Sequence, residues 1–179
     1  SNHPFGIWEV FGVGSILLQI RPDTRALLSY LFQPLLELHP QMIFVDPRSN
    51  HTNSKRNRNA NREAGTHLRA GHSLFLCPAG HVSRLSLRQS KITDPPWSQL
   101  AVKLAIRFNA IIVPIFVHGR NSWLYQLSSC CSLSFANLLL IREFNRMTGR
   151  SVRVEFGEAI LTNQLNDYPD DVTRTEFVR

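Results

Sequence analysis

The sequence has few cysteines, and none of them is placed to form a disulfide framework. Its three cysteines include the adjacent pair Cys130 and Cys131, and no paired Cys-x-x-Cys spacing indicates a metal site. Long apolar runs are also lacking. The closest candidate, residues 100–117, is interrupted by Lys103, Arg107 and Pro114, whereas a membrane span requires about 20 predominantly apolar residues. The sequence therefore predicts a reducing compartment, no transmembrane segment and no cleavable signal at its start.

Acidic residues are scarce relative to basic ones. The chain has 20 Lys and Arg against 13 Asp and Glu, which gives a formal net charge of +7 and a pI near 10.0. This excess favours an anionic partner, either nucleic acid, an anionic membrane face or a phosphate-bearing substrate. The basic cluster SKRNRNANR, residues 54–62, could contact nucleic-acid phosphates, but no module with stacking aromatics accompanies it. A solvated basic face is the preferred interpretation, with anionic lipid head groups as its partner if it has one.

A chain of 179 residues, 43% of them hydrophobic, is long enough for one domain with a packed core. Short apolar runs alternate with segments of helical periodicity, which predicts an α/β fold with a mixed, largely parallel sheet flanked by helices. Chemistry in such folds lies where loops leave the carboxyl ends of strands. The last residues of the chain are expected to pack loosely. The expected strands are residues 25–28, 42–47, 72–78, 110–117 and 151–157; helices are expected within 10–38 and over 59–69, 96–108 and 135–147, and polar loops over 48–58 and 79–94.

The first candidate site is the stretch NHPFGIWE at the start of the chain, which contains His3 and Glu9. On one continuous helix, two side chains six residues apart would point to nearly opposite faces. Pro4, however, favours an extended conformation at His3, Gly6 permits a sharp bend, and the apolar run after Glu9 can begin a helix. His3 and Glu9 could then face each other as a base and its orienting carboxylate. The alternative is that both are ordinary surface residues.

Two later loops carry residues suited to binding an anion. In CPAGHVSR, residues 77–84, Gly80 allows close backbone approach to a phosphate, and Arg84 can supply charge-assisted hydrogen bonds. In VPIFVHGRNS, residues 113–122, Arg120 and Asn121 follow an expected strand, so they either touch a substrate head group or stabilise the loop. His118 is expected to be structural.

A metal site and a reactive thiol are the less favoured interpretations of these loops. His3, Glu9 and His81 could together bind a metal, but their spacing matches no recognised ligand pattern, so no metal and no cofactor are expected. Cys77 lies in or beside a buried strand, which argues against a reactive thiol.

The three loops together resemble the blocks of the glycerolipid and lysophospholipid acyltransferase superfamily. The match is closer to a bacterial subgroup associated with hemolysins and ornithine-lipid synthesis, whose blocks resemble NHPxGxxD, FPAGEVSR and PVxxGxNS. The stretches ITDPPW, GRNSWLYQL and IREFNRMTGRSVRVEFGEAI also resemble that subgroup, so the resemblance covers nearly the whole chain. It implies a single acyltransferase-like domain over residues 1–179 that lacks an N-terminal supporting segment.

The resemblance also implies a reaction and its participants. His3 would be the general base, Glu9 would orient it, and an acceptor hydroxyl would attack an acyl thioester directly. The donor would be acyl-acyl-carrier protein or acyl-coenzyme A, and the acceptor a lysophospholipid or a lyso-ornithine-lipid-like molecule, at the cytoplasmic face of an anionic membrane. No nucleic acid or cofactor is implied. The substrate-binding candidates are Pro78, Gly80, His81, Arg84, Arg120 and Asn121.

The chain departs from the subgroup at three positions. Glu9 replaces an aspartate, Cys77 replaces an aromatic residue, and His81 replaces a glutamate that is thought to organise the acceptor site. Residues 78–93 contain no carboxylate, so this loop is predicted to form a purely basic pocket. The alternative function is therefore a degenerate, non-catalytic lipid-binding module.

Overall fold

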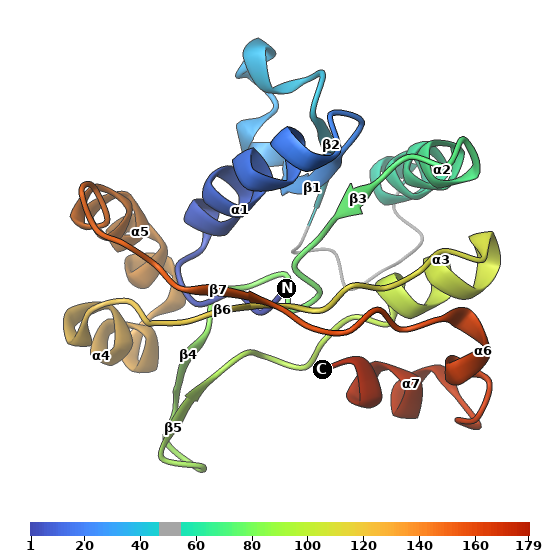
Figure 1. The fold of residues 1–179 in the computed structure, drawn as a ribbon. Helices are drawn as coiled ribbons and strands as arrows, with labels where there is room; N and C mark the ends of the chain where they lie inside the picture. The colour runs from blue at the N-terminus through green and yellow to red at the C-terminus, as the bar shows by residue number, and fades with distance from the viewer. Residues whose placement is uncertain (47–54) are drawn as a thin grey trace.

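The computed structural model describes residues 1–46 and 55–179, so most of the loop expected over 48–58 lies outside the described residues (Figure 1). The first half of the chain supplies a small sheet and the helices around it. Its elements are α1 (Ile7–Ile20), β1 (Arg25–Ser29), the short 3-10 helices η1 (Tyr30–Phe32) and η2 (Leu36–Leu38), β2 (Met42–Val45), α2 (Lys55–Arg69) and β3 (Leu74–Phe75).

These first three strands form a parallel sheet in the order β2-β1-β3. The sheet has a core on each face because side chains alternate along β1. Ala26 and Leu28 point into a cluster with Val10 and Val13 of α1, whereas Leu27 packs with residues of α2 and α3 (Leu100–Phe108). Helices therefore cover both faces of the sheet, as expected for parallel strands.

The second half of the chain departs from the predicted single sheet. β4 (Arg84–Ser86) and β5 (Lys91–Thr93) form an antiparallel hairpin where a polar loop was expected. β6 (Ile115–Val117) pairs antiparallel with β7 (Val154–Phe156). The reason is that two helices, α4 (Trp123–Cys131) and α5 (Leu133–Arg146), connect β6 to β7 and return the chain in the opposite direction. The prediction of a largely parallel sheet holds only for β1, β2 and β3.

Several helix boundaries also differ from the predicted ones. α3 begins at Leu100 rather than at residue 96, because the segment containing Pro95 and Pro96 is not helical. Helix α4 was not predicted; the Ser122 side chain caps it by accepting a hydrogen bond from the amide of Tyr125. Among the described residues, no helix is long and apolar enough to cross a membrane.

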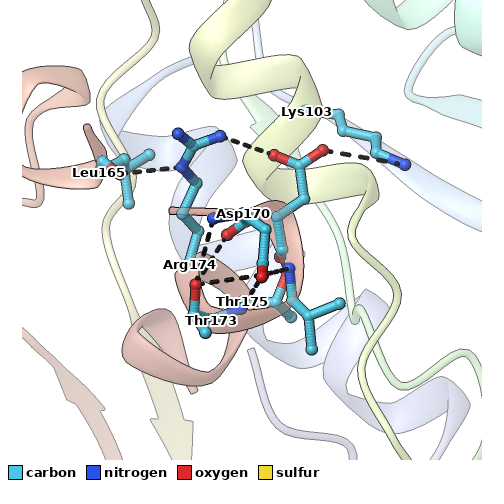
Figure 2. A network of polar contacts seen from close by, with 8 residues as sticks. Lys103, Leu165, Asp170, Thr173, Arg174 and Thr175 are labelled. Carbon is cyan, nitrogen blue, oxygen red and sulfur yellow. Dashed lines mark hydrogen bonds and ion pairs between the residues drawn. The ribbon is translucent and has the colours of Figure 1, made fainter. Parts of the chain in front are cut away.

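The C-terminal residues form two helices, α6 (Thr162–Leu165) and α7 (Asp171–Val178), and the prediction of loose packing is wrong. Figure 2 shows Arg174 at the centre of this region: its Nε donates to the Leu165 carbonyl at 2.9 Å, and its Nη1 donates to Asp171 at 2.9 Å. Asp170 caps α7 through the amides of residues 172 and 173. Val178 is buried against α3 and α6, so α7 contributes to a core cluster. The partly acidic composition of the segment gave no indication of this packing.

Candidate active site

The three loops singled out from the sequence meet around residues 2–9. The Asn2 side chain accepts from the Val117 amide at 2.7 Å and donates to the Val117 carbonyl at 2.9 Å, which fixes the first loop to the end of β6. The Ser83 amide donates to the His3 carbonyl at 2.8 Å, which ties the second loop to the first. The third loop is held by a close approach, because Gly119 lies directly against the ring of Phe5.

His3 and Glu9 face each other, with His3 Nδ1 3.5 Å from Glu9 Oε2. Gly6, at φ +84°, makes the bend that separates the coil carrying His3 from the first turn of α1, where Glu9 lies. The Phe5 amide donates to Glu9 Oε1 and fixes the carboxyl group from its other side. The Glu9 side chain is fully buried and that of His3 is 14% exposed. The pairing expected from Pro4 and Gly6 is therefore present, and neither residue is an ordinary surface group.

Burial controls the protonation of the pair. Loss of hydration lowers the pKa of His3 to about 4, against a smaller opposing effect of the nearby Asp94 charge. Loss of hydration likewise raises the pKa of Glu9 to about 8, against the amides of Phe5 and Glu9, which favour the carboxylate. At neutral pH the His3 imidazole is therefore uncharged and the Glu9 carboxyl is mostly protonated. Above about pH 8 the pair becomes a neutral imidazole beside a carboxylate.

Asp94 belongs to this site although the sequence predicts it only as the last residue of a polar loop. Its carboxylate accepts from the Ser83 hydroxyl, from the His3 amide at 3.3 Å and from Trp97 Nε1 at 2.9 Å. It therefore joins the first loop, the second loop and the segment leading to α3. A signal was present in the sequence: Asp94 is the first carboxylate after residues 78–93, which have none.

The second loop presents its candidate residues at different depths. Pro78 is buried and its carbonyl accepts from the Ser98 amide at 2.9 Å. Gly80 is exposed at φ +64°, and His81 is exposed and close enough for its charge to lower the pKa of His3. Arg84 is half-buried at the start of β4. His81 is thus the basic group of this loop whose charge acts on the dyad, whereas the charge of Arg84 acts on Tyr125 of α4.

Cys77, the first residue of this loop, is not suited to nucleophilic chemistry. Burial raises the pKa of its thiol to about 12, so the thiolate is scarcely populated at neutral pH. Among the described residues, no group of three His, Cys, Asp or Glu side chains is arranged to hold a metal ion.

The third loop separates its two candidates. The Arg120 guanidinium is exposed and stacks over Trp123 at 4.3 Å. Asn121 is buried, and its side-chain amide has no hydrogen-bond partner among the described residues. Neither side chain forms a hydrogen bond or ion pair with the dyad. His118 Nε2 lies 3.2 Å from Glu155 of β7, in keeping with the structural role expected for it.

A cavity of about 1600 Å³ opens beside the site between β3 and β6. Asn2 and Pro4, on either side of His3, line it together with Asp94. Most of its other lining is apolar, including Leu74, Phe75, Leu104, Ile112 and Ile115. In the part of the chain that the structure describes, β3 pairs only with β1 and β6 only with β7, so each of these two strands has one edge without a partner strand, and on β6 the Asn2 side chain binds the Val117 amide and carbonyl at that edge.

Comparison with known proteins gives one match. Residues 1–179 match the model of a protein family described as acyltransferase, and the match therefore spans the whole chain. No curated protein and no solved structure shows significant similarity to the chain.

Proposed function

The chain belongs to this acyltransferase family, and we propose that it transfers a fatty acyl group from an acyl-acyl-carrier protein or acyl-coenzyme A thioester to the hydroxyl of a lysophospholipid or a related lipid. Membership of the family implies an acyl donor and an acceptor. The observation that carries the finer proposal is the His3–Glu9 pair, buried at the meeting point of the three loops with Nδ1 3.5 Å from the carboxylate.

The chemistry follows from the protonation of this pair. With Glu9 ionised, the Nδ1–H of His3 can donate a hydrogen bond to the carboxylate 3.5 Å away, which leaves the lone pair of Nε2 free to accept a proton. The acceptor hydroxyl gives its proton to Nε2 while its oxygen forms the new C–O bond at the thioester carbonyl. The C–S bond then breaks, and the departing thiolate takes the proton from the imidazolium. Glu9 stabilises that imidazolium, and no covalent enzyme intermediate is required.

The second loop supplies the proposed contacts to the acceptor. The exposed backbone at Gly80 and the basic groups His81 and Arg84 suit a phosphate or other anionic head group beside the base. The Pro78 carbonyl accepts a hydrogen bond from the Ser98 amide, which ties the loop to the segment before α3. The proposed place of action is the cytoplasmic face of the membrane, with the protein bound peripherally. The net charge of +7 supports an anionic surface as the partner.

The test is acyl transfer from labelled acyl-carrier protein and acyl-coenzyme A to a panel of lysophospholipids and a lyso-ornithine lipid. His3→Ala should abolish transfer, whereas His39→Ala, which changes an exposed histidine whose ring contacts the Gln33 carbonyl and Phe44, should leave it unchanged. Unchanged turnover in His3→Ala would rule out the base mechanism.

A second candidate function is a non-catalytic lipid-binding module, which the histidine at position 81 favours because it adds positive charge close to the base. His81→Glu separates the two candidates. A gain in turnover supports an enzyme whose acceptor site is weakened by the histidine. A folded protein that binds lipid but shows no turnover in either form supports the binding module.

A further inference from the structure

The helical hairpin of α4 and α5 exposes a concentration of large apolar side chains to solvent. On α4, Trp123, Leu124 and Leu127 are between 47% and 59% exposed and lie on one face, while Tyr125 and Gln126 on the other face are buried. On α5, the exposed side chains include Phe135, Leu138 and Ile141 at 53%, 71% and 72%. Figure 1 shows the two helices side by side at one edge of the molecule, away from α3 and α7. Such a concentration indicates an interaction surface.

The charges of this segment are of one sign at the surface. Residues 120–150 contain four arginines and one acidic residue, Glu143. Glu143 is fully buried, and it accepts hydrogen bonds from Arg142, Arg146 and the Ser122 hydroxyl. No carboxylate is therefore exposed on the segment, whereas Arg120, Arg142 and Arg150 are exposed beside the apolar side chains.

We propose that the α4–α5 hairpin is the surface through which the protein docks on an anionic lipid bilayer. Apolar side chains flanked only by cations match the boundary between acyl chains and anionic head groups, as in interfacial amphipathic helices. A protein partner with both positive and negative surface charges could bind a surface that exposes carboxylates, whereas residues 120–150 expose none. This inference rests on the proposed function, because the acceptor is a membrane lipid.

The position of the hairpin relative to the site supports the docking. Leu140 of α5 lies against Gly6, in the bend between His3 and Glu9. Val82 of the second loop packs in one cluster with Tyr125 of α4 and Ala136 of α5. A bilayer bound to the hairpin would therefore lie one helix layer away from the loop proposed to hold the acceptor head group.

The experiment is cosedimentation of the full chain with phosphatidylcholine vesicles, with and without phosphatidylglycerol, at low and high salt. We expect binding only to the anionic vesicles, weakened by salt. The double variant Leu127→Ser with Ile141→Ser should lose at least about tenfold in affinity. Leu87→Ser, which removes an equally exposed leucine in the β4–β5 hairpin, should bind as the wild type does. Circular dichroism establishes that each variant is folded.

Unchanged vesicle binding by the folded double variant would overturn the proposal. So would a wild-type dimer that the double variant converts to a monomer, because the surface would then be covered by a second copy. Acyl transfer to a water-soluble short-chain acceptor, which does not require membrane binding, distinguishes failure of the docking proposal from failure of the proposed function. If the wild type shows no transfer to any acceptor but the double variant loses binding, the docking surface stands and the acyltransferase mechanism fails.

Discussion

Asp94 has a greater influence on the proposed base than its distance along the chain suggests. Its carboxylate holds the His3 amide and the Ser83 hydroxyl, and its charge raises the pKa of both His3 and Glu9. The first effect is positional and the second electrostatic. A substitution that keeps the oxygen acceptor and removes the charge separates them.

Asp94→Asn should shift the pH dependence of acyl transfer. Because the Asp94 charge raises the pKa of Glu9, its removal lowers that pKa, and the rise in kcat/KM with pH should move to lower pH. Ser83→Ala is the control, since it removes a hydrogen bond to Asp94 and leaves the charge. The two profiles are compared by measuring initial rates across pH. An Asp94→Asn profile that coincides with the wild type would show that Asp94 does not act on the dyad through its charge.

Gly119 is required where the third loop meets the first. It has φ +129°, and an added Cβ would overlap the ring of the buried Phe5. Gly119→Ala should lower the free energy of unfolding by about 1–3 kcal/mol through overpacking and backbone strain. Gly71→Ala also places a side chain at a positive φ, +81°, but with open space around the new methyl group. In urea unfolding, Gly119→Ala should lose more stability than Gly71→Ala, and equal losses would refute the close approach.

The pairing of His3 with Glu9 could be predicted from the sequence, because Pro4 favours an extended backbone at His3 and Gly6 permits the bend before α1. It did not allow the burial of the pair to be predicted, since burial depends on the packing of three distant loops. The shifted pKa values of His3 and Glu9 follow from that burial. The participation of Asp94 could not be predicted either, because its contacts with His3 and Ser83 depend on the same packing of distant loops. The substrate roles proposed for Arg84, Arg120 and the other loop residues stay predictions.

Among the elements, α7 shows how an acidic, polar segment becomes part of the core. Arg174 is only 20% exposed; it links α7 to the Leu165 carbonyl and to Asp171 (Figure 2). Arg174→Met keeps much of the aliphatic packing but removes these bonds, so it should lower the free energy of unfolding by about 1 kcal/mol. The exposed Arg88→Met is the matched control. Equal stability of the two variants would mean that the apolar contacts of α7 alone hold it in place.

The strand edges of β3 and β6 beside the cavity, which have no partner strand in the described part of the chain, should affect hydrogen exchange. β1 is paired on both sides, whereas β3 and β6 are each paired on one side in the described part of the chain. In hydrogen exchange, the amides of β1 should therefore be the most protected, and those of β3 and of Ile115 in β6 should exchange faster, whereas the Val117 amide is held by Asn2. Equal protection in the three strands would mean that the edges at the cavity are covered in solution. Because a fatty acyl chain has no hydrogen-bonding groups, it could not satisfy such edges.

Strand positions were predicted better than strand pairing. Residues 42–45, 115–117 and 154–156 all lie within predicted strands. Apolar runs reveal that a segment is buried and extended, but they do not reveal its partner. The pairing of β6 with β7 depends on the α4–α5 hairpin between them, and α4 was not predicted because its apolar residues face outward as well as inward.

For the whole molecule, the family match and the geometry support the same reading from different observations. The match over residues 1–179 establishes membership of an acyltransferase family. The buried His3–Glu9 pair, with three loops around it, is the pair that we propose as the base and its orienting carboxylate. The central claim is that Glu9 in its ionised form makes His3 the base that deprotonates the acceptor hydroxyl.

The measurement that tests this claim most directly is the pH dependence of kcat/KM for acyl transfer in the wild type and in Glu9→Gln. Burial raises the pKa of Glu9 to about 8, so wild-type activity should rise with pH up to about that value as the carboxyl loses its proton. Glu9→Gln cannot ionise, and it should be slower by about a hundredfold or more, with no rise near pH 8. A Glu9→Gln enzyme with the wild-type rate and the wild-type pH profile would contradict the account.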